Sequence, residues 1–167
     1  LIYLEDRAPV FYSQERVGKD GATFKVHKFR SMRSDAEKGG KPQWAAQNDP
    51  RVTRVGNFIR KTRIDELPQI VNVFKGEMSF VGPRPLTQSD VVRLGWDGEH
   101  HKMRWDVKPG IVGLAQLSPI CNKKMSWFYD KLYVKHHNLW LDTKIFCAAI
   151  FIPIVGKKKI QNWIHKT

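Results

Sequence analysis

The sequence predicts a single mixed α/β domain of the α+β type over residues 1–167, mainly helical, with a small sheet or hairpins and amphipathic helices. A length of 167 residues fits one ordinary domain that buries a core. Helical periodicity dominates after residue 53, whereas short segments punctuated by glycine occupy the first third. No glycine-rich dinucleotide fingerprint occurs, which argues against a Rossmann fold.

Composition indicates a folded and strongly basic protein. The 29 lysines and arginines against 16 acids give a net charge of +13, which favours polyanionic partners such as nucleic acid, anionic lipid or phosphorylated substrates. Hydrophobic residues at 41% and aromatics at 11% exclude a disordered basic tail. Cys121 and Cys147 lack the close partners of a zinc or disulfide framework, so we expect a reducing, cytoplasmic setting.

The first third reads as a hairpin. Residues 10–12 and 23–32 have strand character, and Gly18 and Gly21 bracket a turn between them. The basic triplet 28–30 at the end of the second segment is, by itself, typical of a solvated strand face.

Two helices are predicted next. The first begins at Thr53 and is basic and amphipathic, and the second runs from Asp65 to Gly76, with apolar residues at helical spacing. Asp65 and Glu66 stand at its beginning, with Pro68 in the first turn. Acids at this place have an ordinary explanation, because they complement the helix dipole and Asp65 suits an N-cap.

The second half adds a strand over 78–81, a stiff turn, a polar helical segment and two further helices over 127–137 and 139–155. The apolar run 145–155 would reach about 17 Å as a helix, against about 30 Å of hydrocarbon in a bilayer. Aromatic and basic flanks make residues 139–167 suitable for a membrane surface. A C-terminal core helix with a solvated basic tail explains the same pattern equally well.

The carboxylate pair gains interest from its charged surroundings. Four cations precede Asp65 within twelve residues, and Arg84 follows on a turn fixed by two prolines. An ionised carboxylate in such a field can coordinate Mg²⁺ and can attack phosphorus, as phosphoryl transfer requires. The six histidines lack metal-ligand spacing, and neither a P-loop nor a nucleophile elbow occurs.

Four separated motifs resemble those of the bacterial sugar transferases, the monotopic phosphoglycosyl transferases that begin capsule, exopolysaccharide or glycoprotein glycan assembly. The likeness covers residues 9–155, and its motifs are Lys28-Phe29-Arg30-Ser31-Met32, Asp65-Glu66-Leu67-Pro68-Gln69, Met78-Ser79-Phe80-Val81-Gly82-Pro83-Arg84-Pro85-Leu86 and Lys108-Pro109-Gly110-Ile111.

The resemblance implies transfer of a sugar 1-phosphate from a UDP-sugar to polyprenyl phosphate, undecaprenyl phosphate being the usual acceptor, with release of UMP and with Mg²⁺ as cofactor. Asp65 would be the nucleophile that carries the phosphosugar, and Glu66 would support metal binding and catalysis. Both carboxylates are therefore expected metal ligands. The expected substrate and phosphate contacts are basic: Lys28, Arg30, Arg84 and Lys108.

The resemblance also implies the cytoplasmic face of the bacterial inner membrane, with anionic lipid as a partner and no nucleic acid. Family members carry a hydrophobic anchor ahead of this region, and none precedes Leu1, so we expect a catalytic portion without that anchor. One departure concerns Ser118–Asn122, where the family usually has a Gly-Arg-containing stretch. This difference puts nucleotide or sugar contacts in the loop in doubt. The sugar, the polyprenol length, the pathway and the oligomeric state do not follow from the sequence.

Two alternatives belong to other classes. Basic charge interleaved with aromatics is also the composition of a nucleic-acid-binding module, although no recognition motif accompanies it here. A catalytically impaired membrane-surface scaffold of the same fold is the other alternative, and the intact Asp65, Glu66 and Arg84 argue against it.

Overall fold

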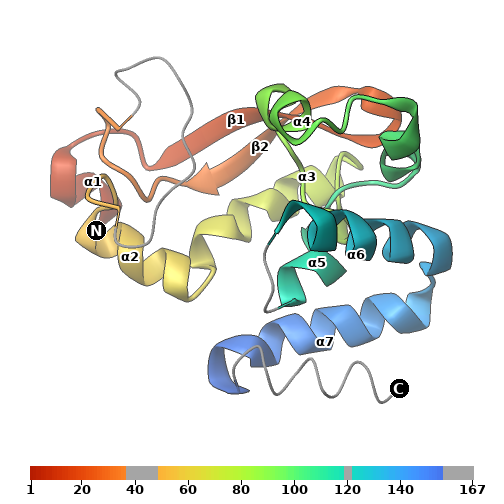
Figure 1. Cartoon of the computed structure of the whole chain (residues 1–167). Coiled ribbons are helices and arrows are strands. Elements are labelled where there is room, and N and C mark those ends of the chain that lie inside the picture. Colours follow the sequence, from red (N-terminus) through yellow and green to blue (C-terminus); the bar gives the residue numbers. More distant parts are fainter. Residues whose placement is uncertain (37–48, 119–121, 156–167) are drawn as a thin grey trace. The chain divides into compact units, whose positions relative to one another are not determined.

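A computed structural model describes residues 1–36, 49–118 and 122–155 (Figure 1). The chain groups into two compact units, the first made of residues 1–13 and 27–69 and the second of residues 14–26 and 70–167. Helices together with two small two-stranded sheets confirm the predicted mixed class. The single-domain boundary over 1–167 stays a prediction, and positions 119–121 and 156–167 lie outside the described residues.

The predicted hairpin is confirmed. Strands β1 (Phe11–Val17) and β2 (Thr23–Phe29) form one two-stranded sheet, joined through the short 3-10 turn η1 (Lys19–Gly21). The amide of Gly18 donates to the carbonyl of Ala22 at 2.7 Å and closes the turn. Gly21 has a φ of +77°, which glycine adopts without steric cost.

The first unit contains α1 (Ile2–Asp6) and α2 (Arg54–Lys61). The predicted start of the basic helix is confirmed, because the Thr53 side chain accepts a hydrogen bond from the amide of Gly56 at 2.9 Å. Glu5 on α1 accepts from the first two amides of α2, at 2.7 and 3.1 Å. A carboxylate from another helix therefore satisfies donors that a helix start leaves open.

The segment after α2 differs from the predicted single helix. It divides into the 3-10 helix η2 (Ile64–Gln69) and the short α3 (Ile70–Phe74). Pro68 lies inside η2 and has no amide to donate, so the α-helical hydrogen-bond pattern begins only after it. Arg63, with a φ of +60°, has a left-handed backbone conformation between α2 and η2. Asp65 and Glu66 therefore lie inside a 3-10 turn.

The second unit is organised around a parallel pair of short strands, β3 (Ser79–Val81) and β4 (Gly110–Val112), with Ser79 opposite Gly110. The backbones approach closely beyond β3, since a Cβ atom on Gly110 would lie 2.1 Å from the Gly82 nitrogen. Only glycine fits there. The predicted strand over 78–81 is confirmed.

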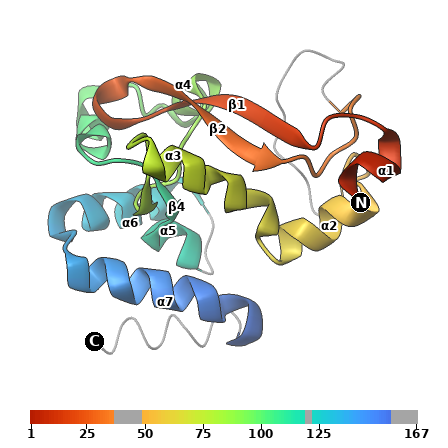
Figure 2. The same ribbon diagram turned by 180° about the vertical axis from the view of Figure 1, so that it is seen from behind.

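Along the described chain, five helices follow β3: α4 (Gln88–Leu94), the 3-10 helix η3 (Glu99–Asp106), α5 (Leu114–Leu117), α6 (Lys123–His136) and α7 (Leu139–Val155). Figure 2 shows α7 beside α5 and α6. Ile145 and Ala148 of α7 are 1% and 3% exposed and join the core with side chains of β3, α5 and α6. In the described chain no helix combines the length and the apolar character needed to cross a membrane.

Candidate active site

The predicted site residues fall in both units. The first unit contains Lys28 on β2, Arg30 directly after β2, and the carboxylates Asp65 and Glu66 on η2. The second unit contains Arg84, after β3, and Lys108, before β4. The predicted site residues thus form two sets, and each set is described within its own unit.

Glu66 is held between two cations. Its side chain is 11% exposed, and Lys28 Nζ donates to Oε1 at 3.2 Å while Arg63 Nη1 lies 3.5 Å from Oε2. Lys28 lies near the end of β2, 38 residues before Glu66, whereas Arg63 lies three residues before Glu66. One distant and one local cation therefore hold this carboxylate. The structure thus brings together the predicted Lys28 and Glu66.

Asp65 has a different environment from its neighbour. It is half-buried, and within the described part of the chain it neither accepts a hydrogen bond nor forms an ion pair. Burial, and secondarily the charge of Glu66, raise its pKa above the usual 3.8, while Lys28, Arg60 and Arg63 oppose the rise. A partly desolvated carboxylate without bonded partners keeps its lone pairs available to an electrophile.

Arg60, one of the cations acting on Asp65, is itself held in place. Its Nε donates to Ser31 Oγ at 2.7 Å, and Ser31 is buried. The Ser31 carbonyl accepts from the Thr53 amide at 3.1 Å, and a Cβ atom on Gly56 would lie 2.0 Å from that carbonyl oxygen. Segment 28–32 is therefore docked tightly on α2, which explains why a glycine occurs in this helix.

Arg30 is committed to another partner. Its guanidinium donates to both oxygens of Asp6, at 2.9 and 2.5 Å, and to the carbonyl of Ala8 at 3.0 Å. Such a bidentate pair is geometrically specific. In the free protein Arg30 thus ties β2 to the segment that follows α1, and its predicted role in phosphate binding stays a prediction.

Arg84 is the only exposed residue between positions 81 and 87. The turn that carries it follows β3, where the amide of Gly82 donates to the Val112 carbonyl at 2.9 Å. Lys108 is exposed as well, and its carbonyl oxygen lies against Gly82, where a Cβ atom would come within 2.4 Å. Within the second unit, the two predicted phosphate-binding cations thus stand on adjoining backbone segments.

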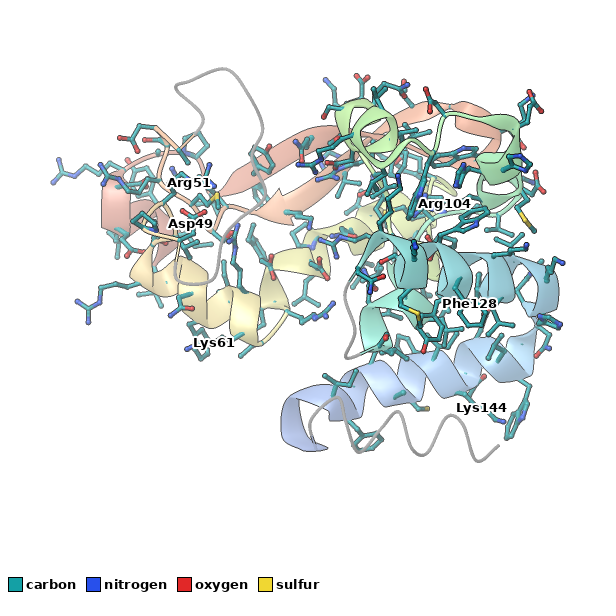
Figure 3. All side chains as sticks on the ribbon, in the orientation of Figure 1. Asp49, Arg51, Lys61, Arg104, Phe128 and Lys144 are labelled. Carbon is teal, nitrogen blue, oxygen red and sulfur yellow. The ribbon has the colours of Figure 1, made fainter. Side chains whose placement is uncertain are left out.

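Sequence reasoning missed a buried ion pair in the second unit. Arg104 Nε donates to Asp130 Oδ2 at 2.8 Å, and the two side chains are 2% and 5% exposed. Arg104 is labelled in Figure 3. A separation of 26 residues joins η3 to α6, so local periodicity carries no signal for this pair.

Protein side chains at this site supply only some of the oxygen ligands that Mg²⁺ needs. Among the described residues, no cluster of three or more His, Cys, Asp or Glu side chains could hold a metal ion. Mg²⁺ is commonly bound by one or two carboxylates together with substrate phosphates and water. Asp65 and Glu66 supply two such carboxylates, which suits a cation that shares its ligands with a diphosphate substrate.

Comparison with known proteins gives a consistent result. Residues 1–156 match the family described as bacterial sugar transferase. The chain is 42% identical over 161 residues to a UDP-N-acetylgalactosamine-undecaprenyl-phosphate N-acetylgalactosaminephosphotransferase of Aeromonas hydrophila, covering 93% of this chain and 38% of that protein. It is 39% identical over 163 residues to a UDP-glucose:undecaprenyl-phosphate glucose-1-phosphate transferase of Escherichia coli, covering 93% and 35%.

A shorter match is more similar. A putative undecaprenyl-phosphate N-acetylgalactosaminyl 1-phosphate transferase of Bacillus subtilis is 64% identical over 85 residues, which is 51% of this chain and 47% of that protein. The chain thus spans between a third and a half of the length of these relatives.

Proposed function

The chain belongs to the bacterial sugar transferase family, and from this membership we propose that it transfers a sugar 1-phosphate from a UDP-sugar to polyprenyl phosphate. UMP is the leaving product and a polyprenyl-diphosphate sugar is the lipid product. In this proposal the reaction is the first membrane step of capsule, exopolysaccharide or glycan assembly, at the cytoplasmic face of the bacterial inner membrane. The names of the relatives, which specify undecaprenyl phosphate, support this choice of acceptor.

The environment of Asp65 is the observation that carries the proposal. In the first step a carboxylate oxygen of Asp65 attacks the β-phosphorus of the UDP-sugar. The bond between that phosphorus and the bridging oxygen breaks, and UMP leaves with the bridging oxygen. Because Asp65 accepts no hydrogen bond from the residues described, its oxygens need not break an existing bond before they attack.

In the second step a phosphate oxygen of the polyprenyl phosphate attacks the same phosphorus. The bond from phosphorus to the Asp65 oxygen breaks, which regenerates the carboxylate and leaves the sugar diphosphate on the lipid. The acceptor is already an anion at neutral pH, so the reaction needs no strong general base.

Charge neutralisation is the main demand on the remaining residues. Lys28 and Arg63 hold Glu66, and Arg60 adds positive potential at Asp65. Arg84 and Lys108 are the proposed phosphate contacts of the second unit. Mg²⁺, held by Asp65 and Glu66 with substrate oxygens, would supply further neutralisation of the diphosphate.

Helix α7 supports the proposed contact with a membrane of anionic lipid. One side of α7 enters the core, whereas five large apolar side chains are 41% exposed or more: Leu139, Trp140, Phe146, Ile150 and Phe151. Lys144 Nζ lies 5.1 Å from the Trp140 ring centroid, which combines an aromatic and a cationic group as interfacial helices do.

The decisive experiment measures UMP release and intact protein mass. The natural protein, purified in detergent, is incubated with Mg²⁺ and UDP-N-acetylgalactosamine, UDP-galactose or UDP-glucose, the sugars that the names of relatives suggest. We expect one donor to give a mass increase of one sugar phosphate, mapped to Asp65 by peptide analysis. Added undecaprenyl phosphate should discharge this adduct.

The Asp65→Asn protein is the matched control, because it keeps the shape of the side chain and replaces the nucleophilic carboxylate by a neutral amide. We expect it to show neither adduct nor UMP release. Turnover without any adduct would contradict the covalent step alone. No turnover with any of the three donors in the presence of lipid would contradict the proposed transfer and favour a scaffold of the same fold.

A further inference from the structure

Nearly all backbone carbonyls in the turn that carries Arg84 accept hydrogen bonds. Five of its six backbone carbonyls between positions 81 and 86 accept a hydrogen bond. Two of the donors are backbone amides, from Gly110 to the Pro83 carbonyl at 2.9 Å and from Val17 to the Leu86 carbonyl at 2.8 Å. The other three donors are side chains.

Each side-chain donor is held by a carboxylate. Arg104 Nη2 donates to the Arg84 carbonyl at 2.6 Å and is paired with Asp130. The Tyr133 hydroxyl lies 3.1 Å from the Val81 carbonyl and 2.9 Å from Asp142 Oδ1, so its single proton is shared between these two acceptors. A third donor, Arg16, reaches the Pro85 carbonyl at 3.3 Å and lies 3.6 Å from Asp90.

Arg104 is the most constrained of the three. Its guanidinium carbon lies 5.4 Å from the centroid of Trp96 and 4.9 Å from that of Trp105, so aromatic rings border the planar fork. Its Nε is directed at Asp130 and its Nη2 at Arg84, which leaves little freedom for rotation. A lysine ammonium could bind the Asp130 carboxylate or the Arg84 carbonyl, but it lacks the planar guanidinium whose separate N–H groups reach both.

We propose that Arg104, locked by Asp130, is a positioning residue that fixes the backbone of Arg84 so that the exposed Arg84 side chain meets the substrate phosphate in one orientation. This inference rests on the proposed function, which assigns Arg84 to phosphate binding. Stability alone does not account for the pair, because buried ion pairs are often no better than apolar residues of the same volume. A donor aimed at the carbonyl of the phosphate-binding residue has a use that an apolar replacement lacks.

The test is a double-mutant cycle on kcat/KM for the donor with the highest turnover, in the natural protein in detergent. Arg104→Lys should lower kcat/KM about tenfold, as expected for the loss of one hydrogen bond to a held group, mainly through KM for the UDP-sugar. In the Arg84→Ala background the same substitution should cost nothing further, because its effect passes through Arg84. An equal loss in both backgrounds would overturn the proposal.

Arg51→Lys is the matched control. Arg51 is also paired with an aspartate, with Nη2 2.6 Å from Asp49 Oδ2 (Figure 3), and it also donates to the carbonyl of Ala36 in the first unit. Arg51→Lys should change kcat/KM by the same factor in the wild-type and Arg84→Ala backgrounds. Asp130→Asn, which keeps an acceptor for Arg104, provides a second variant if Arg104→Lys does not fold.

Hydrogen exchange of the ligand-free protein supplies a readout that does not depend on turnover. Arg104→Lys should raise amide exchange at least about tenfold in peptides covering 82–86, with little change in the first unit. Unchanged exchange in this turn would overturn the positioning role even if the enzyme is active. If Arg84→Ala has wild-type kcat/KM while Asp65 still forms its adduct, the positioning proposal fails and the proposed function stands.

Discussion

Asp65 in the first unit and Asp130 in the second are both carboxylates whose pKa is raised chiefly by burial, yet among the residues that the structure describes only Asp130 accepts a hydrogen bond. Asp130 is 5% exposed at its side chain and accepts a hydrogen bond from Arg104 at 2.8 Å. Asp65 is half-buried, and Lys28, Arg60 and Arg63 act on its carboxylate through longer-range charge, with no ion pair to it in the described part of the chain.

The difference shows that burial alone does not mark a reactive carboxylate. Asp130 accepts a hydrogen bond from the buried Arg104, so its role in the fold is structural. Asp65 bears part of the desolvation cost and has no hydrogen-bond partner among the described residues, which is an arrangement that favours attack on an incoming electrophile. Predictions on the two aspartates should therefore separate activity from stability.

The largest effect is expected for Asp65→Asn. Turnover should fall by about a thousandfold or more, because the substitution replaces the attacking carboxylate by a neutral amide. The melting temperature at neutral pH should not fall and should rise slightly, since the raised pKa means that ionised Asp65 disfavours the folded state. Kinetics and differential scanning calorimetry on the same preparation test both points.

The size of that stability gain depends on pH. An acid whose folded pKa is raised destabilises the fold above its usual pKa of 3.8 and not below it. The gap in melting temperature between the variant and the wild type should therefore shrink as the pH falls toward 3.8. A gap that widens in acid would contradict the burial of Asp65.

Asp130→Ala should show the opposite pattern, with stability as its main loss. Removing one partner leaves Arg104 buried with an uncompensated charge, which costs about 3–5 kcal/mol. Urea unfolding followed by tryptophan fluorescence measures the change in unfolding free energy. The double variant Arg104→Met with Asp130→Leu should regain much of it, and if stability were the sole role of the pair, kcat/KM would recover in parallel.

Glu66→Gln is expected to have an intermediate effect on activity, about tenfold in kcat, because the side chain keeps its size and loses its charge. The Mg²⁺ concentration for half-maximal rate should rise, since one of two carboxylate ligands becomes neutral. The charge of Glu66 raises the pKa of Asp65, so the acid limb of the pH profile should move to lower pH. An unchanged Mg²⁺ dependence would remove Glu66 from the metal site.

The helices and turns of this protein were largely predictable from local pattern. Apolar spacing located α2, an uninterrupted apolar run indicated α7, and the two prolines around Arg84 indicated a fixed turn. The 3-10 character of η2 was missed, because Pro68 is compatible with a helical first turn and its effect depends on the left-handed conformation at Arg63. Local sequence patterns therefore locate helices well, but they distinguish 3-10 from α-helical hydrogen bonding less well.

Partners distant in sequence were the harder part. The motif identified Lys28 and Glu66, but their contact joins residues 38 apart, and the pairs Arg30 with Asp6 and Arg104 with Asp130 are separated by 24 and 26. Such pairs follow from how strands and helices pack, which periodicity does not encode. The sequence therefore indicated the candidate chemistry, while the difference between Asp130, which accepts a hydrogen bond, and Asp65, which accepts none from the described residues, required the structure.

The smallest effect is expected for Arg60→Gln, and it tests whether the charge around Asp65 acts as the geometry suggests. Arg60 opposes the rise in the pKa of Asp65, so its removal should raise that pKa further. Asp65 would then be protonated at higher pH, and the acid limb of kcat/KM should move to higher pH.

Lys61→Gln is the control for Arg60→Gln, because Lys61 is the next cation on α2, is exposed, and is not among the charges acting on Asp65 (Figure 3). It changes the net charge by the same amount and should leave the acid limb in place. Salt should reduce the shift caused by Arg60→Gln only in part, since Arg60 and Asp65 are partly buried and screened less than surface charges. Equal shifts in the two variants would mean that net charge, and not the Arg60 side chain held by Ser31, sets the ionisation of Asp65.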